Sequence, residues 1–210
     1  MAYKVPRMKM KNFFLAISMT VIAICAYAQN EVGSVTIQPK VGFNIADITD
    51  ANENNPRFGL VAGAEFEYQV SERLGLAVGL VYSAQGDKET RFDNYGNKVK
   101  LSEQLDYINF PIMANLYIVK GLAVKLGIQP GLNLKADYEF KSGGVSVSGS
   151  FSDLGIDIES FDFSVPVGLS YEYKKFVLDA RYNIGLTKIV DGDSSKNSVF
   201  QFTLGYKFNL

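Results

Sequence analysis

Apolar and polar side chains alternate along most of this chain. The pattern is clearest in the last eleven residues, 200–210. Phe200, Phe202, Leu204, Tyr206, Phe208 and Leu210 occupy one phase, and Gln201, Thr203, Gly205, Lys207 and Asn209 occupy the other. A period of two predicts a β-strand with one apolar and one polar face. Strands of about 9–11 residues are also long enough to cross a bilayer when they are tilted.

The same alternation recurs seven more times, so the sequence predicts eight strands. They cover residues 35–45, 58–70, 74–85, 105–118, 122–136, 161–173, 176–185 and 200–210. The connections alternate between long and short, and the long ones cover residues 46–57, 86–100, 137–160 and 187–197. This asymmetry is typical of outer-membrane barrels, whose short turns face the periplasm. The predicted fold class is therefore all-β, an eight-stranded antiparallel up-and-down transmembrane β-barrel.

Four prolines fall inside the predicted strands: Pro39, Pro111, Pro130 and Pro166. Proline has no N–H to donate to a strand ladder. We therefore expect β-bulges or shorter strands at these positions.

The N-terminus predicts a cleaved secretory signal peptide over residues 1–28. Basic residues precede an apolar run, 13–25, that ends in Ala26-Tyr-Ala28. A basic region, a short apolar region and an A-x-A site are the three parts of such a signal. The alternative is a transmembrane anchor helix, but the run is short for one and is interrupted by Ser18 and Thr20. Residues 29–210 are then a single barrel domain.

Cleavage would change the charge balance. The whole chain has 21 basic and 22 acidic residues, and the signal removes four basic and no acidic ones, which leaves a net charge of −5. It would also remove Cys25, the single cysteine, and the chain has no histidine. This balance does not indicate nucleic-acid binding.

The face that carries the apolar phase decides between two kinds of barrel. A soluble barrel of the lipocalin type would place it inside. Five or six large apolar side chains from each of eight strands would overfill so narrow an interior, so we expect them to face lipid. Aromatic residues near the short turns predict an interfacial girdle: Tyr68, Tyr171, Tyr173, Phe176, Tyr206 and Phe208.

The opposite phase carries charges of both signs, which must pair if they are buried. We predict a salt-bridged network that plugs the lumen; an alternative is a proton or ion path. Its members would be Lys40, Glu65, Glu67, Lys125, Glu172, Asp179, Arg181 and Lys207. Lys135 is a further lumen candidate on the same grounds.

The composition predicts no catalytic, cofactor or metal site. Without histidine or cysteine the mature chain can build neither a Ser-His or Cys-His pair nor a zinc site. The acidic residues in 47–55 and the pair Asp191 and Asp193 could offer oxygens to Ca²⁺, but solvated loops explain them better. We therefore expect no enzyme and no cofactor.

Two short motifs, Pro39-Lys-Val-Gly-Phe-Asn44 and Tyr107-Ile-Asn-Phe-Pro-Ile-Met113, carry a family resemblance. With the signal and the strands they resemble the PorT-like outer-membrane β-barrels of Bacteroidota, small barrels of the OmpX and OmpA type. The resemblance implies insertion through the C-terminal strand by the barrel-assembly machinery. Most of that family has no assigned activity.

The predicted location is the outer membrane, with membrane lipid as the main partner. We expect a structural or surface-interaction role in which long extracellular loops contact a partner outside the cell. The alternative functions are small-solute transport and ligand binding, either in a membrane pore or in a soluble periplasmic barrel.

Overall fold

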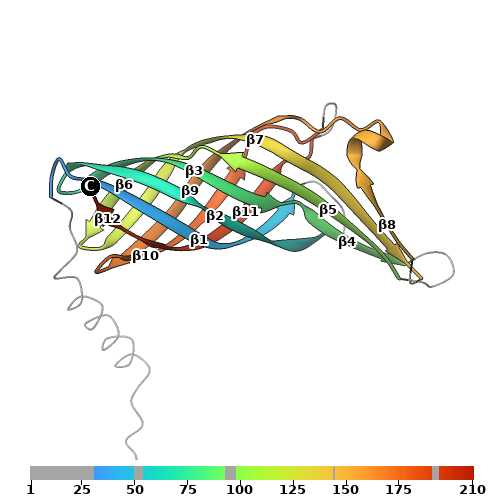
Figure 1. Ribbon diagram of the computed structural model, residues 1–210, viewed down its shortest axis with the longest axis horizontal. Helices are drawn as coiled ribbons and strands as arrows, with labels where there is room; N and C mark the ends of the chain where they lie inside the picture. Colours follow the sequence, from blue (N-terminus) through green and yellow to red (C-terminus); the bar gives the residue numbers. More distant parts are fainter. Residues whose placement is uncertain (1–30, 50–53, 93–97, 144, 191–193) are drawn as a thin grey trace, which may run out of the picture.

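The computed structural model describes residues 31–49, 54–92, 98–143, 145–190 and 194–210. The strands in these ranges form an antiparallel barrel that is longer than it is wide (Figure 1). They are β1 (Val35–Ile48), β2 (Asn54–Ser71), β3 (Leu74–Gln85), β4 (Asp87–Phe92), β5 (Lys98–Asn109), β6 (Ile112–Val119), β7 (Leu122–Ser142), β8 (Val145–Ser150), β9 (Phe161–Tyr173), β10 (Phe176–Gly185), β11 (Asn197–Tyr206) and β12 (Phe208–Asn209). A 3-10 helix, η1 (Phe151–Leu154), follows β8.

The C-terminal strands close the barrel against the first strand. In the register of β1 and β11, Lys40 lies opposite Gly205 and Ile45 lies opposite Phe200. β12 continues the seam, with Thr36 opposite Asn209. The alternating stretch at the end of the chain therefore pairs on both edges and leaves no exposed edge in the wall.

The prediction of eight strands is wrong, because ten strands form the ring. They are β1 to β7 and β9 to β11, while β8 pairs with β7 outside the ring and β12 adds a short segment beside β1. Gly86, at φ 109°, separates β3 from β4. Phe110 and Pro111 separate β5 from β6, and Pro111 has no N–H for the ladder. β4 and the start of β5 lie within residues 86–100, which we expected to be a loop.

Of the four prolines, only Pro111 interrupts a strand as expected. Pro39, Pro130 and Pro166 lie inside β1, β7 and β9, in register with Ala64, Phe163 and Asn183 respectively. The expectation of a bulge or a shortened strand is wrong at these three positions.

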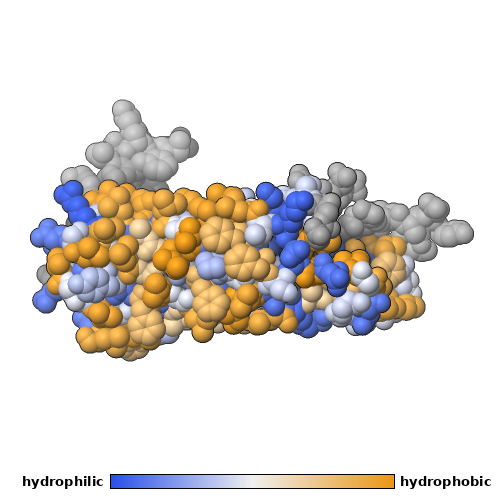
Figure 2. Space-filling model, turned by 90° about the horizontal axis from the view of Figure 1, so that it is seen from above, coloured by the Kyte–Doolittle hydropathy of each residue, from blue (hydrophilic) through white to orange (hydrophobic). Residues whose placement is uncertain are grey.

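The apolar phase lies on the outside of the barrel. Val41, Leu178 and Leu204 are 54%, 60% and 48% exposed, whereas Lys40 and Asp179, their neighbours in the opposite phase, are buried. Figure 2 shows hydrophobic side chains over most of the wall, with hydrophilic ones at its left end and in a band right of centre. This is the reverse of a soluble barrel with an apolar interior, so the lipocalin-like alternative is wrong.

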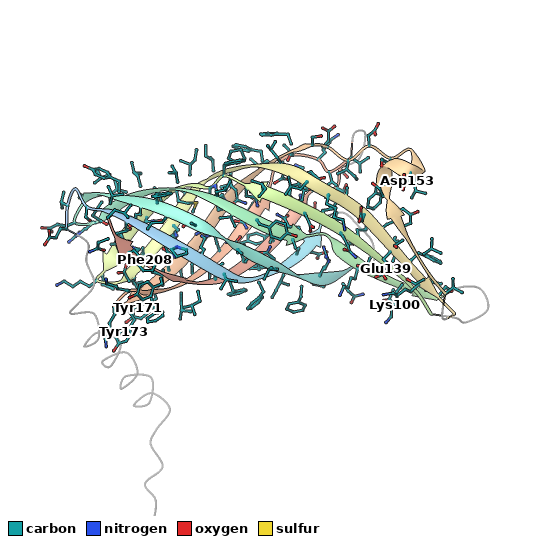
Figure 3. All side chains as sticks on the ribbon, viewed as in Figure 1. Lys100, Glu139, Asp153, Tyr171, Tyr173 and Phe208 are labelled. Carbon is teal, nitrogen blue, oxygen red and sulfur yellow. The ribbon has the colours of Figure 1, made fainter. Side chains whose placement is uncertain are left out.

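Aromatic side chains gather at the short-turn rim. The Phe176 and Tyr206 rings lie 5.1 Å apart, and those of Tyr206 and Phe208 lie 4.7 Å apart. Figure 3 shows Tyr171, Tyr173 and Phe208 at this rim, opposite the end that carries Lys100, Glu139 and Asp153. Aromatic rings at one level are expected at a membrane interface.

On the long-loop side, the sheet continues beyond the barrel. β4, the first half of β5, the end of β7 and β8 form this protruding sheet (Figure 1). Residues 137–160, which we expected to be the longest loop, contain the end of β7, all of β8 and η1. Alternating polar residues there pair as strands instead of forming a loop.

No helix in the described part of the chain is long and apolar enough to cross a membrane. The signal peptide predicted for residues 1–28 lies outside the described residues and stays a prediction.

Candidate functional site

The barrel interior near the short-turn rim holds a cluster around Lys207. Its ammonium lies 2.8 Å from a Glu172 oxygen and 3.2 Å from a Glu67 oxygen. The Tyr117 hydroxyl donates to Glu67 at 2.5 Å and accepts from Lys207 at 3.0 Å. Four elements, β2, β6, β9 and the segment between β11 and β12, therefore meet at this lower cluster.

A second cluster, which we call the middle cluster, lies further into the barrel than the lower cluster. Glu65 binds Lys40, Arg181 at 2.8 Å and Lys125 at 3.4 Å. Asp179 binds Lys125 at 2.6 Å and the Nε of Arg181 at 2.7 Å. All five side chains are buried, so the pairing offsets a desolvation penalty of several kcal/mol per ion.

The two clusters together are neutral. The middle cluster has three cations and two anions, and the lower cluster has one cation and two anions. Their ion pairs bring together all eight residues of the predicted lumen network. Lys135 lies elsewhere, since it is half exposed in the outer half of β7 and binds Asp137 at 2.6 Å. That hydrogen bond raises the pKa of Lys135.

Two glycines on the inner face of β3 make room for the acidic side chains. A Cβ at Gly79 would lie 2.6 Å from Cγ of Glu65, and one at Gly75 would lie 2.5 Å from a Glu67 oxygen. β3 thus provides a flat wall against which the carboxylates of β2 reach their cations.

Neutral polar side chains line the barrel above the middle cluster. Asn44 donates to Ser83 at 2.9 Å and Gln129 donates to Ser164 at 3.3 Å. Some buried polar atoms in this amide layer have no protein partner among the described residues, including both amide atoms of Asn183 and Nε2 of Gln201.

An apolar cluster covers the amide layer at the long-loop end. It consists of Ile48, Leu105, Tyr107 and Ile189, with Ala136, Ile158 and Val190 packed around them. We call it the apolar cap. The loop from β10 to β11 is held there because the Ile189 N–H donates to Ser195 and its carbonyl accepts from Glu159, at 3.0 and 2.8 Å.

A polar network anchors the cap to the lumen. Asn197 donates to the Tyr107 hydroxyl at 3.2 Å and to Asp162 at 3.1 Å. Thr187 donates to the same Asp162 oxygen at 3.2 Å. Sequence reasoning missed the roles of these residues and of Tyr117. The alternation shows that Tyr107 and Tyr117 face inward, but loop residues such as Ile189 have no such periodicity.

The described residues contain no group of three or more His, Cys, Asp and Glu side chains that could hold a metal ion. Asp191 and Asp193, considered above as Ca²⁺ ligands, lie outside the described residues, as do residues 50–53 of the other acidic stretch.

The comparison with protein families decides the class of this barrel. The model of the family described as outer membrane protein beta-barrel domain matches residues 27–191. The chain belongs to this family. It is therefore a protein of the outer membrane, which agrees with its apolar outer surface. The finer resemblance to PorT-like proteins is not part of this match.

Solved structures of outer-membrane proteins are similar to this chain at low identity. Ail, the attachment invasion locus protein of Yersinia pestis, is 16% identical, with a TM-score of 0.46 over 85% of this chain and 100% of that chain. Neisserial surface protein A is 15% identical, with a TM-score of 0.46 over 84% and 97%. OprG from Pseudomonas aeruginosa is 13% identical, with a TM-score of 0.41 over 87% and 98%. No curated protein sequence matches the chain.

Proposed function

We propose that this protein is a non-conducting, non-enzymatic barrel that acts outside the cell through its protruding sheet. The observation that carries the first part is the set of eight paired, mutually neutralising charges in the lumen. The protruding sheet supports the second part.

The ion pairs favour a plug over a path for ions. Arg181 and Lys125 each bind both acids of the middle cluster, so the cluster is cross-linked across the lumen. Moving an ion through it would separate pairs in a site with little water, which is strongly unfavourable. The apolar cap adds a second barrier, because a dry apolar constriction also opposes ion passage.

The protruding sheet is suited to binding an extended segment of another protein. β8 pairs with β7 and with no other described strand, so its second edge is open. Val145 and Val147 on β8 are 65% and 51% exposed. An exposed, uncharged edge is a template for β-strand addition.

The absence of histidine and cysteine from the mature sequence supports a non-enzymatic role. The proton transfers of barrel hydrolases near neutral pH depend on histidine. The charged residues of the lumen form ion pairs with one another, as Glu65 and Asp179 do, and so are not free to act on a substrate.

The second candidate function is binding or transport of a small polar solute. The observation in its favour is the amide layer, where Asn183 and Gln201 retain hydrogen-bonding atoms without a protein partner. A polar solute or water could use those atoms. A solute path would require both the apolar cap and the middle cluster to open.

Attachment assays test the surface role. Cells that display the wild-type protein should attach to one another or to host matrix more than cells without it. A Val145→Lys/Val147→Lys variant should lose this gain, because charges on an edge strand oppose pairing. The control is Leu154→Lys/Ile156→Lys, which adds the same charges at exposed positions outside β8. Equal attachment with and without the protein would overturn the surface role.

Membership of the PorT-like group within this family is also a proposal. The motifs around Pro39 and Tyr107 support a PorT-like member from Bacteroidota that is inserted by the barrel-assembly machinery. A signal peptide over residues 1–28 would supply its export. N-terminal sequencing of the mature protein would test the cleavage site, since the expected first residue is Gln29.

A further inference from the structure

One groove on the apolar outer wall ends at positively charged turns. It has a volume of about 560 Å³ and crosses β9, β10, β11 and β1. Its walls include Val41, Phe43, Leu169, Leu178, Phe202 and Leu204. Ala180 forms the floor, since it lies in register between Leu169 of β9 and Phe202 of β11. A methyl group between two large side chains leaves the wall hollow at this point.

The lower end of this groove reaches two turns of the short-turn rim. Leu122 and Tyr171, which line that end, lie opposite each other in the register of β7 and β9. The chain turns at Lys120-Gly121 just before Leu122, and at Lys174-Lys175 just after Tyr173. The Glu172 N–H donates to the Gly121 carbonyl at 2.7 Å, which holds the first turn against the end of β9.

The two turns at this end of the groove carry only positive charges. Lys120, Lys174 and Lys175 are exposed. Glu172, the acid beside these turns in the sequence, binds Lys207 in the lumen at 2.8 Å. The three lysines are therefore available to an anion at the membrane surface. The Lys174 ammonium lies 5.6 Å from the centre of the Tyr173 ring, so it stays at the level of the aromatic girdle.

We propose that this groove binds one anionic phospholipid of the periplasmic leaflet. An acyl chain would lie over Ala180, and the phosphate would bind among Lys120, Lys174 and Lys175. The occupant follows from position and charge: the groove opens to the hydrocarbon and ends at a basic rim, which is the arrangement that recognises an anionic headgroup. The side of the membrane follows from the family, in which short turns face the periplasm.

A second groove provides the internal comparison. It has a volume of about 550 Å³ and crosses β2, β3, β6 and β7. Ala114 is its small residue, in register between Leu76 and Leu126. The turn between β2 and β3 below it carries Glu72 and Arg73, whose charges are opposite. This groove is equally apolar, and Lys120 in the turn between β6 and β7 also lies at its lower end. It has one lysine there instead of three, and Glu72 offsets Arg73, so its selection for lipid charge should be weaker.

Native mass spectrometry of the full-length mature barrel tests the proposal. The protein is reconstituted in vesicles of equal parts phosphatidylglycerol and phosphatidylcholine and then released into detergent. The wild type should retain one phosphatidylglycerol in preference to phosphatidylcholine. Lys174→Gln/Lys175→Gln should reduce that preference about 25-fold, at about fivefold for each lysine. Ala180→Phe should abolish retention of the lipid by filling the groove.

The matched controls are Arg73→Gln and Ala114→Phe, which should retain phosphatidylglycerol as the wild type does. A boiled and unboiled gel shift verifies that each variant is folded. Equal retention of the two lipids by the wild type would overturn the proposal, and so would equal loss in the variants and their controls. Neither result depends on whether the lumen conducts or the protruding sheet binds a partner.

Discussion

Arg181 and Asp179 lie two residues apart on the lumen face of β10 and form a two-point ion pair. Nε and Nη2 of Arg181 contact the two carboxylate oxygens of Asp179 at 2.7 and 2.9 Å. The same guanidinium reaches Glu65 on β2 at 2.8 Å, three strands away around the ring. Bidentate pairing of this kind is strong and fixes geometry, so Arg181 joins two sides of the barrel.

Arg181→Ala should destabilise the barrel. It leaves Asp179 and Glu65 buried with less compensation, and breaking a buried pair on one side costs about 3–5 kcal/mol. Unfolding in urea, followed by the gel shift, would show a lower midpoint. The comparison is Asp179→Leu/Arg181→Met, which removes both charges and should be more stable than the single variant. A double variant less stable than Arg181→Ala would contradict the pairing.

Lys207→Met should also destabilise the barrel, since Glu67 and Glu172 then lose their shared cation. The expected loss is about 3 kcal/mol or more. Lys135→Met is the matched control, because Lys135 is half exposed and pairs only with Asp137 among the described residues. An exposed pair contributes about 0–1 kcal/mol. Equal shifts of the urea midpoint in the two variants would show that burial of Lys207 has no special effect.

Gly79→Val should disrupt the middle cluster without touching a charge. Its Cβ would lie 2.6 Å from Cγ of Glu65, and the backbone carbonyl of Ala64 leaves it little room to move. Overpacking typically costs about 1–3 kcal/mol. Val78→Ile, at the adjacent lipid-facing position, should leave the unfolding midpoint unchanged. A tolerated Gly79→Val would mean that the wall of β3 is not required to be flat.

Ile189→Ala should loosen the apolar cap while the barrel stays folded. A large-to-small change in a packed site costs about 2–5 kcal/mol. A loss of this size raises the equilibrium constant for opening of the cap by at least about 30-fold. Trypsin cleavage after Lys188, which is exposed beside Ile189, should accelerate accordingly. Leu186→Ala is the control, because Leu186 is 48% exposed in the same loop. Equal cleavage rates in the two variants would show that Ile189 does not stabilise the cap.

The sequence predicts the wall and the lumen charges because both follow from a period of two. Once Val41 and Leu178 face outward, their neighbours Lys40 and Asp179 must face inward. Opposite charges inside a narrow barrel then have few partners other than one another. The specific pairs do not follow. Lys207 binds Glu67 and Glu172, and this depends on the tilt and stagger of strands that are far apart in the chain.

Strand number and loop structure were harder to predict. A single proline out of four, Pro111, breaks a strand, while the other three lie inside paired strands, so a proline alone does not predict where a strand ends. Residues 86–100 and 137–160 are mostly polar, so a prediction that identifies strands by their apolar residues assigns them to loops. In the protruding sheet, however, both faces can contact water, so the apolar signal is weak although the backbone pairs.

Single-channel recording in planar bilayers tests the closed lumen most directly. Purified wild-type protein, verified as folded by its gel shift, is inserted and recorded at both polarities in moderate salt. The ion pairs of Glu65 and Asp179 beneath the cap at Ile189 predict a flat current without discrete steps. Reproducible conductance steps of constant size would contradict the plugged barrel.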